Sequence, residues 1–200
     1  RGVVASNPGA SLVDLGDGVL AVEFHSKMNA IGGDTVAMLH QGVREAARNF
    51  RALVVGNEAP AFSAGANLML VLLEAQEGNW DEIDVMVRQF QGATQAMQQS
   101  TVPVVVAPAG LALGGGCEII LHGDRVQAGA ETYMGLVEVG VGLIPAGGGT
   151  KEMLARAMET APATDDLLQF VRPVFETIGF AKVSTSARHA HDLGYLRDVD

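Results

Sequence analysis

Apolar and polar residues alternate regularly near the start of the chain. Residues 10–15 and 19–24 show the period of two that is typical of half-buried strands, and Gly-Asp-Gly at 16–18 suits a hairpin turn. Between residues 34 and 49 the apolar side chains recur at helical spacing, with Asp34 as the expected N-cap. The pattern predicts a strand hairpin followed by an amphipathic helix.

The rest of the chain continues to alternate between short apolar segments and longer amphipathic ones. Further strands are expected at residues 52–55, 102–107, 125–128 and 195–196. Helices are expected at 67–77, 80–100, from the glycine run to about 122, and at 150–159, 170–182 and 184–193. Pro173 is tolerable only in the first turn of its helix. Residues 56–66 and 134–144 are expected to be loops. This order predicts an α/β fold with glycine-rich strand-to-helix turns.

Composition narrows the classes of function. The 200 residues suit one domain, and 48% hydrophobic with 18% charged residues is a globular composition. No apolar run is long enough to span a bilayer, so no membrane association is expected. A net charge of −10 without a dense basic cluster argues against a nucleic-acid partner. The single cysteine, Cys117, excludes an internal disulfide and fits a reducing, cytoplasmic location.

Two glycine-rich turns share one design. Phe-Ser-Ala-Gly-Ala-Asn-Leu at 62–68 and Leu-Gly-Gly-Gly-Cys-Glu at 113–118 both follow a predicted buried strand. Small residues at a helix start let backbone N–H groups approach a ligand oxygen, and two such donors aimed at one point make an oxyanion hole. Each turn alone also suits a tight turn or a close helix–strand contact. The glycine patterns of nucleotide-binding loops do not fit, since no G-x-G-x-x-G follows a strand.

Two glutamates lie in apolar surroundings. Glu118 is about one turn into the helix that the glycines open, and Glu138 is flanked by apolar and glycine residues. Burial raises the pKa of a carboxyl group, and two carboxyl groups in one pocket can serve as acid and base on one substrate. The alternative is a solvated loop carboxylate at 138 and a structurally satisfied one at 118.

Taken together, these segments resemble the enoyl-CoA hydratase/isomerase (crotonase) family. The resemblance rests on residues 61–68, 103–118, 124–126, 135–145 and 147–150, with weaker agreement at 27–30 and 187–196. Residues 25–34 and 78–84 are similar to the hydratase-like portion of long bacterial 3-hydroxyacyl-CoA dehydrogenases of fatty-acid β-oxidation. Residues 1–200 are therefore expected to be a single crotonase-like domain, excised from a longer multifunctional chain and lacking the family's usual C-terminal helices.

The resemblance implies a fold, a reaction and site residues. The implied fold is a right-handed spiral of ββα turns, and the implied assembly is a homotrimer or a multiple of one, with a dehydrogenase domain in the full-length chain. Glu118 and Glu138 are the implied catalytic pair, and the N–H groups of Ala66 and Gly115 the implied oxyanion hole. Implied contacts to the CoA moiety are Lys27, Ala30, Ala64 and Leu68. No metal or cofactor is expected, because CoA arrives as part of the substrate.

The expected reaction is hydration of a trans-2-enoyl-CoA, with Glu118 activating the water and Glu138 delivering the proton to C2. An isomerase using one carboxylate and a non-catalytic scaffold are the alternatives within the family. A serine hydrolase built from Ser63, His122 and Asp124 fits the roles of a catalytic triad poorly. Residues 151–182 depart from the family pattern, as does Asn67, which replaces an aspartate common in relatives. The former departure leaves the preferred acyl length open.

Overall fold

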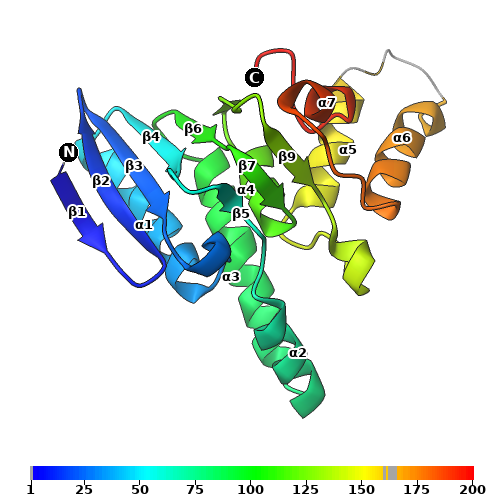
Figure 1. Ribbon diagram of the computed structural model, residues 1–200, viewed down its shortest axis with the longest axis horizontal. Helices are drawn as coiled ribbons and strands as arrows, with labels where there is room; N and C mark the ends of the chain where they lie inside the picture. The colour runs from blue at the N-terminus through cyan, green and yellow to red at the C-terminus, as the bar shows by residue number, and fades with distance from the viewer. Residues whose placement is uncertain (1, 160, 162–165) are drawn as a thin grey trace.

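The strands form two sheets of different size (Figure 1). The computed structural model describes residues 2–159, 161 and 166–200, and within this part the larger sheet has the order β1-β2-β3-β4-β6-β8. Its strands are β1 (Gly2–Ser6), β2 (Ala10–Gly16), β3 (Val19–Phe24), β4 (Ala52–Gly56), β6 (Val104–Ala107) and β8 (Arg125–Val126). The smaller sheet joins β5 (Ala61–Ser63), β7 (Gly110–Leu113) and β9 (Thr132–Gly135) in parallel.

The chain passes repeatedly from the large sheet to the small sheet and then into helix. The first such turn runs β4, β5, α2 (Leu68–Glu77) and α3 (Trp80–Gln98). The second runs β6, β7 and α4 (Gly115–Leu121), and the third runs β8, β9 and α5 (Gly149–Glu159). Because β3, β4, β6 and β8 pair in parallel, successive turns stack on one another. The predicted α/β fold and its spiral of ββα turns are confirmed.

The hairpin and first helix form nearly where the hydrophobic pattern places them. Strands β2 and β3 pair antiparallel, and Asp17 and its two flanking glycines all adopt positive φ in the turn. Helix α1 (Gly33–Asn49) begins with Gly32 as N-cap, so the prediction of Asp34 as N-cap is wrong. Asp34 lies instead in the first turn, where its carboxylate faces the positive end of the helix dipole. Strand β1, which pairs with β2, was not predicted.

The small sheet is absent from the sequence prediction. Strand β5 lies inside the segment expected to be a loop, and β9 overlaps the segment 134–144 that was expected to be irregular. These strands have three or four residues and are rich in glycine, alanine and other small residues, so they carry no detectable alternation. They are held by pairing with one another, a contact between distant segments that local patterns do not encode.

The C-terminal part contains three corrections. Helix α6 (Leu168–Gly179) begins early enough that Pro173 is its sixth residue, not a first-turn residue. Helix α7 (Ala187–Asp192) is shorter than predicted and is capped by Ser186, whose side chain accepts a hydrogen bond from the His189 N–H. Tyr195 and Leu196 are buried but form no strand. Residues 160 and 162–165, within the segment that departs from the family pattern, lie outside the described residues.

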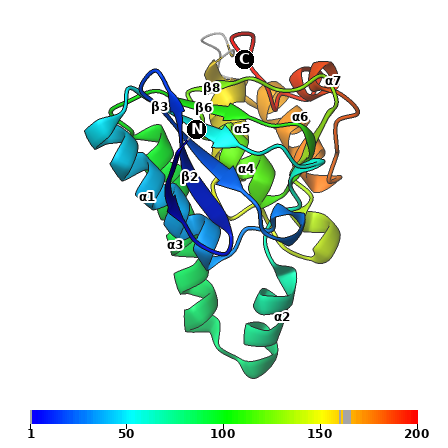
Figure 2. The same ribbon diagram turned by 60° about the vertical axis from the view of Figure 1, so that its left-hand side comes forward.

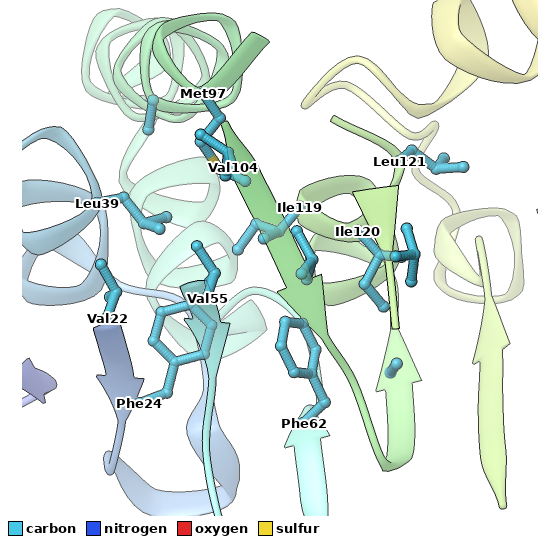
Figure 3. Packing of buried hydrophobic residues seen from close by; sticks show 14 of the residues in the cluster. Val22, Phe24, Leu39, Val55, Phe62, Met97, Val104, Ile119, Ile120 and Leu121 are labelled. Carbon is cyan, nitrogen blue, oxygen red and sulfur yellow. The ribbon is translucent and has the colours of Figure 1, made fainter. Parts of the chain in front are cut away.

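Helices cover the large sheet on the face that carries its apolar side chains. Figure 3 shows side chains of β3, β4 and β6 meeting those of α1, α3 and α4 in one continuous core. The labelled members are Val22, Phe24, Leu39, Val55, Phe62, Met97, Val104, Ile119, Ile120 and Leu121. Helix α2 and the start of α3 extend away from this core (Figure 2), and α2 has no buried residue. Among the described residues, no helix is long and apolar enough to cross a membrane.

Candidate active site

Two glycine-rich turns meet at the end of the small sheet, because β5 and β7 are neighbouring parallel strands. Gly65 and Gly114 both adopt positive φ, at 89° and 52°. A Cβ atom on Gly65 would lie 2.8 Å from the Leu113 carbonyl oxygen and 3.4 Å from the nitrogen of Gly115. Glycine at 65 therefore allows a contact between the two turns that any larger residue would obstruct.

The pairing of Ile31 fixes the direction of the Ala66 N–H group. The Ile31 N–H donates to the Gly65 carbonyl at 2.8 Å, and the Asn67 N–H donates to the Ile31 carbonyl at 3.4 Å. In a parallel ladder the residue between these two, Ala66, points its own N–H away from Ile31. The Ala66 N–H is thus directed toward the β7 side, where Gly115 begins α4 with an N–H that has no partner within its helix. The two predicted oxyanion donors are brought together.

Glu118 is buried at the first turn of α4. The residue is only 3% exposed, and its Oε1 accepts a hydrogen bond from the Gly149 N–H at 2.9 Å. The pKa of Glu118 is raised to about 7, because burial and the nearby charge of Glu138 together outweigh the opposing hydrogen bonds from Gly149 and Gly147. A carboxyl group with such a pKa can hold or release a proton near neutral pH.

Glu138 approaches the same place from the third turn of the spiral. It begins the short 3-10 helix η2 (Glu138–Val141), and a Cβ on Gly114 would lie 3.1 Å from its Oε1. Its Oε2 is buried and has no hydrogen-bond partner among the described residues. Burial raises the pKa of this carboxyl group as well. The predicted catalytic pair is therefore brought close together, with Glu138 against Gly114 and its charge acting on the Glu118 carboxyl group.

The glycine run at 147–149, which the sequence analysis assigned to a helix start and to the family resemblance but to no site role, lies beside Glu118. A Cβ on Gly147 would lie 2.5 Å from the Glu118 Oε2, and a Cβ on Gly148 would lie 2.7 Å from the His122 ring. Nδ1 of His122 lies 2.6 Å from the Glu118 carbonyl oxygen, so this nitrogen carries the proton and donates it. Burial lowers the pKa of His122. Gly147 and Gly149 thus lie against the Glu118 carboxylate, and Gly148 packs on the His122 ring.

The residues predicted to contact CoA gather along one edge of this site. The short 3-10 helix η1 (Lys27–Asn29) lies against β5, because the Ala64 N–H donates to the Met28 carbonyl at 3.1 Å. Ala30 directly precedes Ile31, the residue that bridges Ala66. Exposed among these four are Lys27, Ala64 and Leu68, the last of which begins α2.

The geometry disfavours the serine-hydrolase alternative. The Ser63 hydroxyl is buried and donates to the Asn29 carbonyl at 2.7 Å. His122 donates to the Glu118 carbonyl, and Asp124 accepts the Val104 N–H at 2.8 Å. Each member of the proposed triad thus serves a separate backbone group. Cys117 is buried, and burial raises the pKa of its thiol well above the usual value, so it is not an activated nucleophile.

Comparison with known proteins agrees with this geometry. Residues 14–171 match the family described as Enoyl-CoA hydratase/isomerase. A probable 3-hydroxyacyl-CoA dehydrogenase of Bacillus subtilis (strain 168) is 48% identical over all 200 residues, which cover 25% of that protein. A probable enoyl-CoA hydratase of Rhizobium meliloti (strain 1021) is 29% identical over 76% of this chain and 57% of its own length.

Solved structures show the same fold. The crystal structure of an enoyl-CoA hydratase from Polaromonas sp. JS666 has a TM-score of 0.79 at 24% identity, covering 94% of this chain and 68% of that one. The chain spans about a quarter of the length of its Bacillus subtilis relative, in keeping with the predicted likeness to the hydratase-like portion of long dehydrogenases. With these matches and the described geometry, the chain belongs to the enoyl-CoA hydratase/isomerase family.

Proposed function

We propose that this chain hydrates trans-2-enoyl-CoA thioesters, with Glu118 and Glu138 as the catalytic pair. The observation that carries the proposal is that the buried carboxyl group of Glu118 and the partly buried one of Glu138 lie near the two glycine-rich turns that present the backbone N–H groups. The carboxyl groups supply acid and base, and the N–H groups supply a site for an oxyanion. The relatives named as hydratases and as a dehydrogenase support a place in fatty-acid β-oxidation, with a dehydrogenase domain as the proposed partner in a longer chain.

The thioester oxygen would accept hydrogen bonds from the N–H groups of Ala66 and Gly115. When hydroxide adds to C3, the C2–C3 π electrons shift through the thioester carbonyl, and negative charge develops on this oxygen. The two N–H groups stabilise that charge, and losing one donor of such a hole typically costs about 100- to 1000-fold in rate. The thioester then re-forms as C2 takes a proton, which completes the addition of water.

The two glutamates would share one proton. In hydration, ionised Glu118 takes a proton from the attacking water while protonated Glu138 gives one to C2. The reverse reaction, dehydration, begins with the proton on Glu118, the group that burial brings to a pKa of about 7. The pair titrates as one unit, so a single shared proton serves both directions.

The test follows the loss of conjugated enoyl-thioester absorbance with crotonyl-CoA as substrate. Glu118→Gln and Glu138→Gln are each expected to lower kcat by at least about 100-fold, in the range of a lost acid–base group. Glu131→Gln, the same change at an exposed position before β9, is the matched control and is expected to keep the parent rate.

The outcomes distinguish the members of the family. A parent chain that leaves crotonyl-CoA unchanged but isomerises a 3-enoyl-CoA would replace the hydratase proposal with the isomerase alternative. A chain that binds acyl-CoA in calorimetry but performs neither reaction would be a scaffold. Equal rates for the parent and both glutamine variants would reject the two-carboxylate mechanism.

A further inference from the structure

The ring of Phe90, on α3, closes one side of the candidate active site. A Cβ on Gly147 would lie 2.2 Å from the ring Cε1 and 2.5 Å from the Glu118 Oε2, so the ring edge and the carboxylate flank the same point. A Cβ on Gly115 would lie 3.3 Å from the ring Cζ and 3.1 Å from the Ile31 Cδ1. Phe90 therefore stands over one oxyanion donor and beside one catalytic carboxylate at once.

Hydrogen bonds from two residues that follow Phe90 on α3 fix this wall in place. The Gln91 side chain donates to the Ala146 carbonyl at 2.7 Å, and the Thr94 hydroxyl donates to the Gly147 carbonyl at 3.1 Å. Helix α3 and the segment before α5 are thus tied together beside the ring. A substrate chain that met the ring could not easily push the two elements apart, because both hydrogen bonds would have to break.

A cavity of about 350 Å³ lies next to Gly147, which is one of its lining residues. It is lined by residues of α3 and of the segment leading into α5, among them Gln91, Thr94, Ile144, Pro145 and Gly147, and by His122. Phe90 directly precedes Gln91, one of the lining residues, but neither Phe90 nor Glu118 lines the cavity. Removing the ring would itself leave room for several methylene groups beside Gly115, Gly147 and the Glu118 carboxylate.

We propose that Phe90 sets the acyl-chain length, limiting the site to short-chain enoyl-CoA thioesters. This inference rests on the proposed hydratase function and names the substrate class of the same site. With the thioester oxygen on Ala66 and Gly115 and C3 beside the glutamates, the carbons beyond C4 meet the ring of Phe90. A chain that cannot pass the ring has no room to extend beside the Glu118 carboxylate, so longer substrates lose the placement of C3 that the reaction needs.

The experiment compares kcat/KM for 2-enoyl-CoA substrates of four, six, eight and ten carbons. The parent is expected to prefer four carbons, and Phe90→Ala to raise the ratio of the eight-carbon to the four-carbon value by at least about tenfold, the discrimination that a few methylene groups provide. Phe90→Leu is expected to fall between them and serves if the alanine variant folds poorly. Phe175→Ala, at an exposed phenylalanine of α6, is the matched control.

Three results would overturn the inference. One is a parent that uses ten carbons as well as four, and another is an unchanged ratio in both Phe90 variants. The third is an equal change in the Phe175 control. A parent that hydrates no chain length at all would reject the proposed function itself, which keeps the two failures apart.

Discussion

The phenol of Tyr195 accepts a hydrogen bond from the backbone N–H of Leu136 at 3.2 Å and donates one to the Lys182 carbonyl at 2.9 Å. Leu136 lies two residues before Glu138, so this fully buried tyrosine anchors the segment that presents a candidate catalytic carboxyl group. Burial raises the pKa of Tyr195, which keeps its hydroxyl protonated. Arg156 in turn donates to the Tyr195 carbonyl at 2.8 Å and connects the anchor to α5.

Removal of the Tyr195 hydroxyl should disturb Glu138 without touching substrate. Tyr195→Phe leaves the buried Leu136 N–H unpaired, which is expected to cost about 1–3 kcal/mol of stability. We expect kcat to fall by more than KM changes, because Glu138 is held less firmly while the oxyanion donors keep their places. Urea unfolding and steady-state kinetics measure the two effects. Tyr133→Phe, at a half-buried tyrosine of β9, is the control, and an equal loss of kcat there would contradict the positioning role.

The pH dependence of kcat/KM is expected to be bell-shaped, because only the singly protonated glutamate pair is productive. Burial brings the pKa of Glu118 to about 7, so the rate falls as the pH rises through about 7 and the shared proton is lost. Burial also raises the pKa of Glu138 above its ordinary value of 4.5. On the acid side, the rate is therefore expected to begin falling at a pH above 4.5. Initial rates with crotonyl-CoA between about pH 4 and pH 9 test this, and a rate that is flat through pH 7 would speak against the shared proton.

Glu118 should also make stability depend on pH. Its folded-state pKa of about 7 lies above its ordinary 4.5, so the folded state binds the proton more tightly than the unfolded state. Stability from this group is fully present below about pH 4.5 and is lost as the pH rises through 7. Relative to the parent, Glu118→Gln should therefore gain up to about 3 kcal/mol between pH 4.5 and pH 8, at about 1.4 kcal/mol per pKa unit.

The measurement is urea unfolding of both proteins at the two pH values. The sign of the difference decides the outcome, because a Gln variant that loses stability relative to the parent at the higher pH would mean that Glu118 is stabilised in its charged form. Glu131→Gln, the same substitution at an exposed position, again provides the matched control.

Gly65→Ala should damage catalysis more than a comparable glycine change elsewhere. The new Cβ would lie 2.8 Å from the Leu113 carbonyl oxygen at a φ of +89°, so the two oxyanion turns must move apart. A drop of about 100- to 1000-fold in kcat/KM is expected for a displaced donor. Gly78→Ala has a similar φ of +75° but meets nothing within 4 Å, which isolates the cost of backbone strain.

Thermal unfolding measures the stability of the two glycine variants, and steady-state kinetics measures their activity. Gly78→Ala is expected to lose about 1 kcal/mol of stability while keeping its activity, since Gly78 caps α2 in the left-handed region. An active Gly65→Ala variant would show that the close contact between the turns is not needed for the reaction.

Most strands of the large sheet and most helices could be predicted because their patterns are local, although β1 was missed. An amphipathic helix such as α1 repeats its apolar residues within the helix itself, β3 shows alternation within its own residues, and β4 is a short apolar run. The small sheet could not be predicted, because β5, β7 and β9 are too short for a period and exist only through pairing. Contacts between distant segments also explain the wrong strand prediction at Tyr195. This residue is buried by such contacts, and its apolar character was taken for that of a strand.

The candidate site also contains residues that could be predicted from the sequence and contacts that could not. Glu118 and Glu138 could be found because a carboxylate among apolar residues is unusual in itself. The partner of Glu118, the Gly149 N–H, lies 31 residues away along the chain, and Phe90 reaches Gly147 from another helix. No local pattern reports such contacts, so the second half of the site emerges only from the fold.

The stacking of ββα turns has a consequence for how the site is assembled. Ala66 belongs to the first turn, Gly115 and Glu118 to the second, and Glu138 to the third. No single turn contains all of these groups. The alignment of one turn on the next therefore sets the spacing between the N–H donors and the carboxyl groups. A slip of one residue in β7 against its neighbours would turn every N–H and side chain of that strand to the opposite side. Catalytic competence would therefore depend on correct alignment among three layers, because the short strands of each layer pair only with strands of another layer.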